Sequence, residues 1–151
     1  MNRNTFPSYK LFIDGGSRGN PGESGIGIVI QSKSQKKGFY FYTGLSTNNE
    51  AEYKALIRAL KISITNGLKN LNIFSDSELL CNQINGTYKV KSDTLKNFHK
   101  EATNLIKKVN TFSINYIPRT KNKEADKLAN IAMNLKKNGE VDLTVAPSTK
   151  L

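Results

Sequence analysis

The sequence predicts an α/β protein in which helices pack on a mixed β-sheet. Apolar runs of strand length come first in close succession and then alternate with segments of helical periodicity. The length of 151 residues suits one domain with one core, and no linker-like stretch divides it. We therefore expect a single domain over 1–151, with a core at about 9–137 and a tail at 138–151 that shows no clear pattern.

The first three predicted strands are short apolar or aromatic runs. They span residues 9–14, 25–32 and 39–45, and β-branched or aromatic side chains favour strands in all three. Between the first two, residues 15–24 are rich in Gly, Ser, Asn and Pro and predict a loop. In this interpretation Asp14 ends the first strand.

From residue 48 onward, apolar residues recur at helical spacing until Asn66-Gly67 signals a helix end. The elements expected after it are a strand at 71–76, a short helix at 77–84, a helix at 92–109, a strand at 111–117 and a helix at 122–137. The strand at 71–76, like the first one, ends in an acid, Asp76.

The formal net charge of +11 and the pI of about 9.8 favour a polyanionic partner. Nucleic acid is the commonest such partner, and an anionic membrane surface comes second. A basic surface that serves only solubility stays open on charge alone.

The lone cysteine, Cys81, cannot form an intramolecular disulfide, and its apolar surroundings predict a small core residue. The first ten residues contain no apolar signal-peptide core, and no apolar run approaches the length that spans a membrane. We expect a cytoplasmic monomer without an obligatory protein partner.

Four acids occupy informative places. Asp14 and Asp76 follow strands, whereas Glu52 and Asp126 fall in the predicted first turns of helices. Strand ends and helix starts meet at the rim of an open sheet with parallel strands. Four carboxylates gathered there would repel one another, and two divalent cations would neutralise them. Hard oxygen ligands suit Mg²⁺, and a cation pair can activate water for phosphodiester cleavage.

Each acid taken singly also has a structural explanation. An acid in the first turn of a helix complements the helix dipole, and an Asp after a strand often caps a turn. Only the four acids taken together favour a metal-binding active site.

Four motifs resemble those of type 1 ribonucleases H in order and spacing: FIDGGSRGNPG, TNNEAEYKAL, IFSDSELL and NKEADKLAN, within residues 11–132. The resemblance implies an α/β ribonuclease H-like fold with a five-stranded mixed sheet flanked by helices. It implies an endonuclease that hydrolyses the RNA strand of RNA–DNA hybrids with two Mg²⁺ ions, or Mn²⁺ in their place, leaving 5′-phosphate and 3′-hydroxyl ends. The implied catalytic and metal-binding residues are Asp14, Glu52, Asp76 and Asp126. Glu50 lies in the second motif, but the family's ligand matches the position before Tyr53.

The resemblance also implies substrate contacts. Asn20 and Asn49 match positions near the scissile phosphate, and Gly15 would give backbone access to a 2′-hydroxyl of the RNA. Hydroxyl groups at helix starts suit a DNA phosphate, although Ser92 equally fits a plain helix cap. The residues matching that phosphate pocket are Thr47, Ser92 and Thr94.

Two departures from the family pattern stand out. The stretch NQINGTYKVKSDTL is too short for the basic helical insertion of many bacterial members, so hybrid binding must use other charges, such as Lys89, Lys91 and Lys96. The loop before the last acid has Arg119, which we expect to contact substrate, and no histidine. These features resemble a subgroup of bacteria and archaea that lacks the insertion. His99, within a predicted helix, is expected to be structural or on the surface.

Three other classes fit less well. A transposase or junction resolvase shares strand-end acids but usually lacks GNPG followed by TNNEAEY. A non-catalytic hybrid-binding module is expected to lose at least one of the four acids. A nucleotide-binding α/β protein would need a dinucleotide fingerprint or P-loop, and the glycine loop fits neither.

Overall fold

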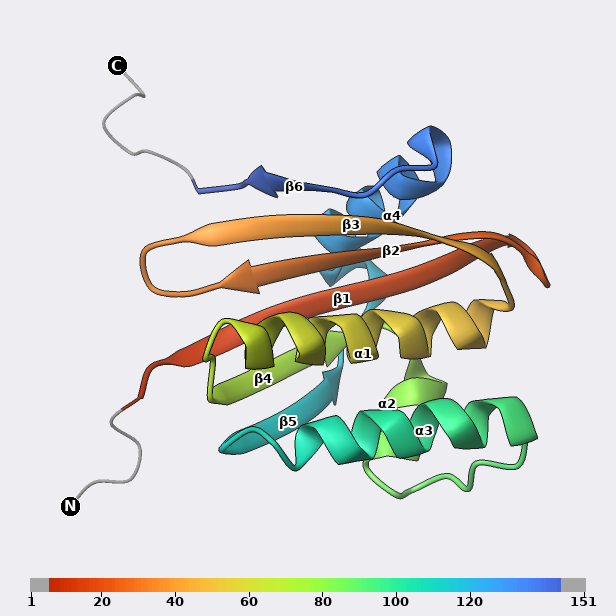
Figure 1. The fold of residues 1–151 in the computed structure, drawn as a ribbon, viewed down its shortest axis with the longest axis horizontal. Coiled ribbons are helices and arrows are strands. Elements are labelled where there is room, and N and C mark those ends of the chain that lie inside the picture. Colours follow the sequence, from red (N-terminus) through yellow and green to blue (C-terminus); the bar gives the residue numbers. More distant parts are fainter. Residues whose placement is uncertain (1–5, 145–151) are drawn as a thin grey trace.

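The computed structural model describes residues 6–144, which form a six-stranded sheet with helices on both faces (Figure 1). The sheet order is β5-β4-β1-β2-β3-β6. β1 pairs antiparallel with β2 and parallel with β4, so the sheet is mixed, as predicted. The strands are β1 Ser8–Gly19, β2 Gly22–Gln31, β3 Lys36–Ser46, β4 Asn70–Ser75, β5 Thr111–Tyr116 and β6 Gly139–Asp142.

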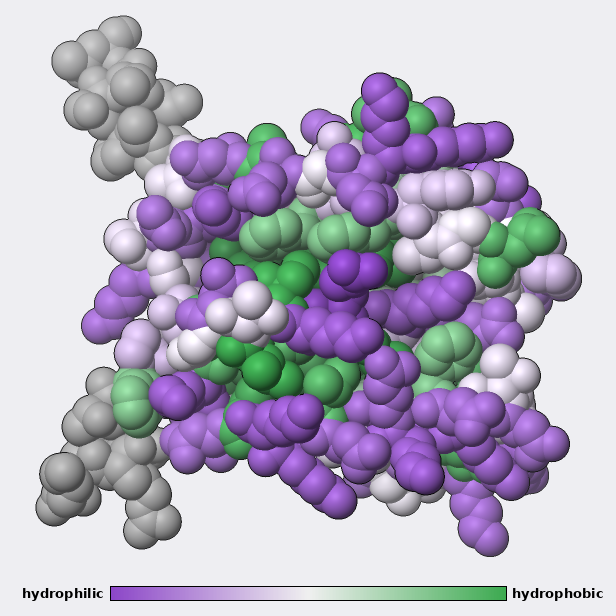
Figure 2. Space-filling model, in the orientation of Figure 1, coloured by the Kyte–Doolittle hydropathy of each residue, from purple (hydrophilic) through white to green (hydrophobic). Residues whose placement is uncertain are grey.

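The helices form two layers around this sheet. α1 and α3 lie on one face, and α4 lies on the other, behind β2 and β3 in the view of Figure 1. Polar residues cover most of the α1 and α3 face, with apolar residues visible beside α1 (Figure 2). The helices are α1 Asn48–Thr65, α2 Glu78–Ile84, α3 Asp93–Ile106 and α4 Lys123–Leu135, with a short 3₁₀ helix, η1, at Arg119–Lys121.

The alternation of side chains along β1 explains why both faces are covered. Leu11 and Ile13 are fully buried in the larger core cluster, which includes the apolar faces of α1 and α3. Phe12 points to the opposite face and packs in the smaller cluster with Val29 and Leu128 of α4. Cys81 is buried in the larger cluster, which confirms it as a small core residue.

The prediction of five strands is wrong by one. Residues 139–142, expected to belong to a patternless tail, form β6, which pairs antiparallel with the edge strand β3. Its sequence, GEVD, is mostly exposed and too short to show an alternating pattern. Residues 145–151 of the predicted tail lie outside the described residues.

The prediction of a loop at 15–24 is also wrong. β1 continues to Gly19 and β2 begins at Gly22, so the two strands form a tight hairpin. Some glycines of these two strands, Gly15, Gly25 and Gly27, allow close packing against helices. A Cβ on Gly27 would lie 2.1 Å from the carbonyl oxygen of Ala125 on α4. Asp14 therefore lies within β1 and does not end it.

Within residues 6–144, no helix has the length and apolar character needed to cross a membrane.

Candidate active site

Three of the four predicted acids converge on one point. Asp14 comes from β1, Glu52 from α1, and Asp76 from the position directly after β4. One carboxylate oxygen of each lies within 4.8 Å of the others. Asp14 and Glu52 are each only 6% exposed, and Asp76 is partly exposed. Buried carboxylates at such separations need a compensating charge.

The sheet register explains why Asp14 and Asp76 meet. β1 and β4 run parallel, and their last paired residues are Ile13 and Ser75. In both cases the acid is the next residue along the chain. Asp14 and Asp76 thus leave the paired region at the same level of the sheet, as expected for the carboxyl ends of neighbouring parallel strands.

Glu52 reaches this point because α1 lies very close to β1. The backbone N–H of Gly15 donates a hydrogen bond to Glu52 Oε1 at 3.0 Å. Glu52 is the fifth residue of α1, one position beyond the first turn in which the sequence predicted it. The Glu52 carboxylate is therefore held by the backbone of β1. Glu52 lies too far into α1 to act only as an acid that complements the helix dipole.

Burial shapes the electrostatics of the cluster. Burial first, and then the charges of Asp76 and Asp126, raise the pKa of Asp14 from 3.8 to about 8. Burial, followed by the charges of Asp14 and Asp76, also raises the pKa of Glu52 well above its usual value. The Gly15 N–H and the Arg119 guanidinium oppose the rise at Glu52. Without a compensating positive charge, Asp14 and Glu52 therefore resist ionisation.

The raised pKa of Asp14 predicts an unusual pH dependence of stability in the cation-free protein. The unfolded chain loses this proton near 3.8, but the folded protein retains it to about 8, so stability falls as pH rises through that window. Melting in a chelator should show a wild-type deficit against Asp14→Asn that is larger at about pH 8 than at about pH 5. Equal pH slopes in the two proteins would refute the assignment.

Asp126 lies in the first turn of α4, as predicted, beside Asp14. It raises the pKa of Asp14 through its charge and through side-chain hydrogen bonding. The triad closest together does not include Asp126.

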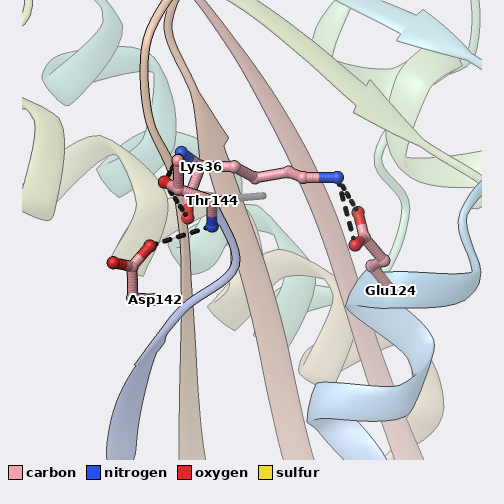
Figure 3. Close-up of polar contacts among 4 residues, drawn as sticks. All are labelled: Lys36, Glu124, Asp142 and Thr144. Atoms are coloured by element: carbon pink, nitrogen blue, oxygen red, sulfur yellow. Dashed lines mark hydrogen bonds and ion pairs between the residues drawn. The ribbon is translucent and has the colours of Figure 1, made fainter. Parts of the chain in front are cut away.

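The start of α4 is tied to β3 and to the segment after β6. Lys36 Nζ contacts both carboxylate oxygens of Glu124 at 3.1 and 3.2 Å (Figure 3). The Lys36 backbone N–H donates to Thr144 Oγ1 at 2.8 Å, and the Thr144 N–H donates to Asp142 Oδ1 at 2.9 Å. Residues 142–144 belong to the tail for which the sequence shows no clear pattern. Through Lys36 they are linked to the first turn of α4, which carries Asp126.

Two predicted phosphate-contacting residues cap helices. Thr47 and Glu50 form a reciprocal capping box at the start of α1, with contacts of 2.9 and 3.1 Å. Ser92 Oγ accepts a hydrogen bond from the Leu95 N–H at the start of α3. Both helices begin on the right-hand side of Figure 1, so these caps lie on the same side of the molecule.

The structure places the remaining predicted contacts on the surface, except Gly15. Asn49, Thr94 and Arg119 are exposed. Asn20 is also exposed, and its Oδ1 accepts a hydrogen bond from the Asn48 N–H at 2.9 Å. The N–H of the buried Gly15 is engaged by Glu52, so it is not free for a substrate hydroxyl.

The two departures from the family pattern hold in the structure. Residues 85–92, between α2 and α3, contain no helix, so there is no helical insertion there. His99 is partly buried on α3, where its Nε2 lies 3.2 Å from the Gln83 carbonyl oxygen. This contact fits the structural role expected for His99.

The sequence reasoning missed Asn122. It is 1% exposed, and its Nδ2 donates to the Ile13 carbonyl oxygen at 2.8 Å and to Asp76 Oδ2 at 3.0 Å. An Asn before a helix usually indicates an N-cap, and that pattern gave no sign of a link to Asp76.

The donor set fits a divalent cation. Three carboxylates supply hard oxygen ligands at close range. Burial and neighbouring negative charges raise the pKa of Asp14 and of Glu52, and a cation would relieve both effects.

Comparison with known proteins agrees with this fold. Residues 12–132 match the family described as reverse transcriptase-like. Ribonuclease HI of Halobacterium salinarum is 35% identical over 127 residues, which are 82% of this chain and 63% of that protein. The structure of the RNase H1 from the same archaeon superposes with a TM-score of 0.79 at 34% identity, covering 84% of this chain and 98% of that one.

Two further relatives extend the comparison. LC11-RNase H1, solved in complex with an RNA/DNA hybrid, superposes with a TM-score of 0.77 at 36% identity, covering 85% of this chain and 98% of that one. Bifunctional protein Rv2228c of Mycobacterium tuberculosis is 36% identical over 124 residues. The match covers 80% of this chain but only 34% of that protein.

The fold and the acidic cluster define a ribonuclease H-like domain. The chain belongs to the type 1 ribonuclease H family.

Proposed function

We propose that this chain is a ribonuclease H that hydrolyses the RNA strand of RNA–DNA hybrids endonucleolytically, leaving 5′-phosphate and 3′-hydroxyl ends. The observation that carries the proposal is the convergence of Asp14, Glu52 and Asp76 within 4.8 Å in a member of this family. The relative solved with an RNA/DNA hybrid supports the substrate class.

The residues that would hold two Mg²⁺ ions, or Mn²⁺ in their place, are Asp14, Glu52, Asp76 and Asp126. When bound, such a cation pair supplies activation of water and stabilisation of the leaving oxygen in phosphodiester hydrolysis. β1, β4 and α1 fix Asp14, Asp76 and Glu52, so the chain pre-organises the ligands before cations or substrate arrive.

The proposed hybrid contacts, apart from Gly15, are partly or fully exposed polar residues. Arg119 is exposed and close enough to the acids to lower the pKa of Asp14 and Glu52, which favours a contact near the scissile phosphate. The helix starts capped by Thr47 and Ser92 present N–H groups that suit phosphate oxygens. The other proposed contacts are Asn20, Asn49, Thr94 and the carbonyl oxygen of Gly15, since the Gly15 N–H is engaged by Glu52.

Cations outside the cluster would replace the missing helical insertion. Lys89, Lys91 and Lys96 are exposed between the end of α2 and the first turns of α3. Contacts of lysine to phosphate oxygens position a duplex without reading its sequence, so we propose hybrid binding with little sequence preference. No obligatory protein partner is needed for this arrangement, and we propose that a monomer is active.

The test is cleavage of a hybrid with labelled RNA by the purified protein in Mg²⁺ or Mn²⁺. We expect RNA cleavage with either cation and none in a chelator. RNA that survives both cations over a broad pH range would refute the function. End-labelling of the products with and without phosphatase treatment tests the proposed 5′-phosphate.

A pair of neighbouring glutamates provides a matched control for the ligand assignment. Glu52→Gln should lose most activity because the amide lacks the charge of a metal ligand. Glu50→Gln should retain activity within about threefold, because glutamine also serves at this position of a capping box. If the two variants lose similar activity, the assignment of Glu52 is wrong.

A further inference from the structure

Asn122 stands at the N-cap position of α4, but its side chain makes no capping hydrogen bond. The cap residues of the other three α-helices do use their side chains in this way. Asparagine is among the best N-cap residues, so a side chain turned away from its own helix gives up a favourable contact. The Asn122 amide therefore forms its hydrogen bonds outside its own helix.

The Asn122 amide points toward the acidic cluster. Its Nδ2 donates to the Ile13 carbonyl oxygen at 2.8 Å and to Asp76 Oδ2 at 3.0 Å. Both partners are acceptors, so they fix which end of the amide is the nitrogen. Ile13 directly precedes Asp14, so one amide group links the backbone beside Asp14 to the carboxylate of Asp76.

The backbone of Asn122 adds a link to the fourth acid. Its carbonyl oxygen accepts a hydrogen bond from the Asp126 N–H at 3.1 Å, and its own N–H donates to the Arg119 carbonyl oxygen at 3.0 Å. Asn122 therefore contacts β1, the residue after β4 and the first turn of α4, which together carry three of the four acids.

The amide oxygen shows that this arrangement is costly. Asn122 Oδ1 is buried and has no hydrogen-bond partner within residues 6–144. Buried unpaired acceptors are unfavourable and are found where another demand outweighs the cost. Asn70, by comparison, is 4% exposed and uses both ends of its amide, with contacts to Phe6, Asn110 and Thr111.

We propose that Asn122 is a positioning residue that holds the Asp76 carboxylate in place, relative to Asp14, for divalent-cation binding. This inference rests on the proposed metal-dependent function. The hydrogen bond restricts rotation of the Asp76 side chain and directs one of its oxygens, Oδ2, toward Nδ2. Outer contacts of this kind orient metal ligands, and their loss commonly costs metal affinity.

The test is calorimetric titration of Mn²⁺ and of Mg²⁺ into the protein without nucleic acid. Asn122→Ala should weaken cation binding by about 10- to 100-fold. Asn122→Ser, which keeps one donor in a smaller side chain, provides a second variant if the alanine variant does not fold. Hybrid cleavage should then require a correspondingly higher cation concentration for half-maximal rate.

Asn70→Ala is the matched control, because Asn70 is buried at the opposite end of β4 and hydrogen-bonded. It should lower the melting temperature and leave cation affinity unchanged. The inference is overturned if both Asn122 variants bind cations within about twofold of wild type, or if Asn70→Ala weakens binding equally. If wild type binds cations but cleaves no hybrid, the proposed function fails and the titration still decides the role of Asn122.

Discussion

Asp14→Asn is expected to reduce hybrid cleavage by about 1000-fold or more. A bound cation supplies several kcal/mol of transition-state stabilisation, and about 1.4 kcal/mol corresponds to a tenfold change in rate. Asp14 belongs to the triad and also contacts Asp126. Its loss should therefore impair both proposed cation positions.

The same substitution is expected to leave the cation-free protein at least as stable as wild type. Burial and the charges of Asp76 and Asp126 raise the pKa of Asp14 to about 8, so keeping this carboxyl in the folded protein at neutral pH is unfavourable. Asparagine has nearly the same shape and carries no charge. Functional sites commonly carry such a local cost in stability.

The two halves of this prediction are measured on one preparation. Thermal melting in a chelator reports stability, and cleavage of labelled hybrid with Mg²⁺ or Mn²⁺ reports activity. Asp142→Asn is the control, since it makes the same chemical change on β6, away from the acids, and the amide oxygen can still accept from Thr144. A variant that keeps more than about a tenth of the activity would show that Asp14 is not a metal ligand.

The sequence was most informative about the acids because the sheet register turns their positions into proximity. Asp14 and Asp76 each follow an apolar run, and parallel pairing of those runs through Ile13 and Ser75 brings the acids together. Glu52 was predicted in the first turn of the helix and lies one position beyond it, yet the start of the helix was predicted correctly. Its interaction with β1 depends on a backbone contact that side-chain periodicity does not reveal.

The glycine-rich segment shows where local pattern and tertiary structure diverge. From local propensity, Gly15 and Gly16 are predicted to lie in a loop, because glycine weakens a strand. In the folded protein, Gly27 and Gly15 lie against the backbones of α4 and α1. The advantage of lacking a Cβ appears only once the helices are in place.

Polar residues with two compatible roles also limited the prediction. Thr47 and Ser92 fit both a helix cap and a phosphate contact, and the structure shows the caps. Asn122 fits a cap by sequence, but its amide instead contacts Asp76. β6 has only four residues, and it depends on pairing with β3 and on the contacts around Lys36.

Gly15→Ala is expected to cause the largest loss of stability among single methyl additions near the site. The new Cβ would lie 2.1 Å from the Ala51 carbonyl oxygen, 2.3 Å from the Ala51 carbonyl carbon and 2.7 Å from the Glu52 nitrogen. All three atoms are backbone, so no side-chain rotation relieves the clash. Overpacking usually costs about 1–3 kcal/mol, and we expect at least the upper end here, which corresponds to a fall of about 6–12 °C in melting temperature.

Activity should fall as well, at temperatures where Gly15→Ala remains folded. The alanine N–H can still donate to Glu52 Oε1, so a loss of cleavage reports displacement of α1 and not removal of a donor. Gly16→Ala is the control one residue away, because its Cβ would meet only the Met133 Cε, at an ordinary 3.6 Å. Thermal melting and hybrid cleavage of both variants test whether a side chain at residue 15 displaces α1. If Gly15→Ala melts within about 2 °C of Gly16→Ala, less than about 1 kcal/mol separates them, and α1 does not depend on the absence of a side chain at residue 15.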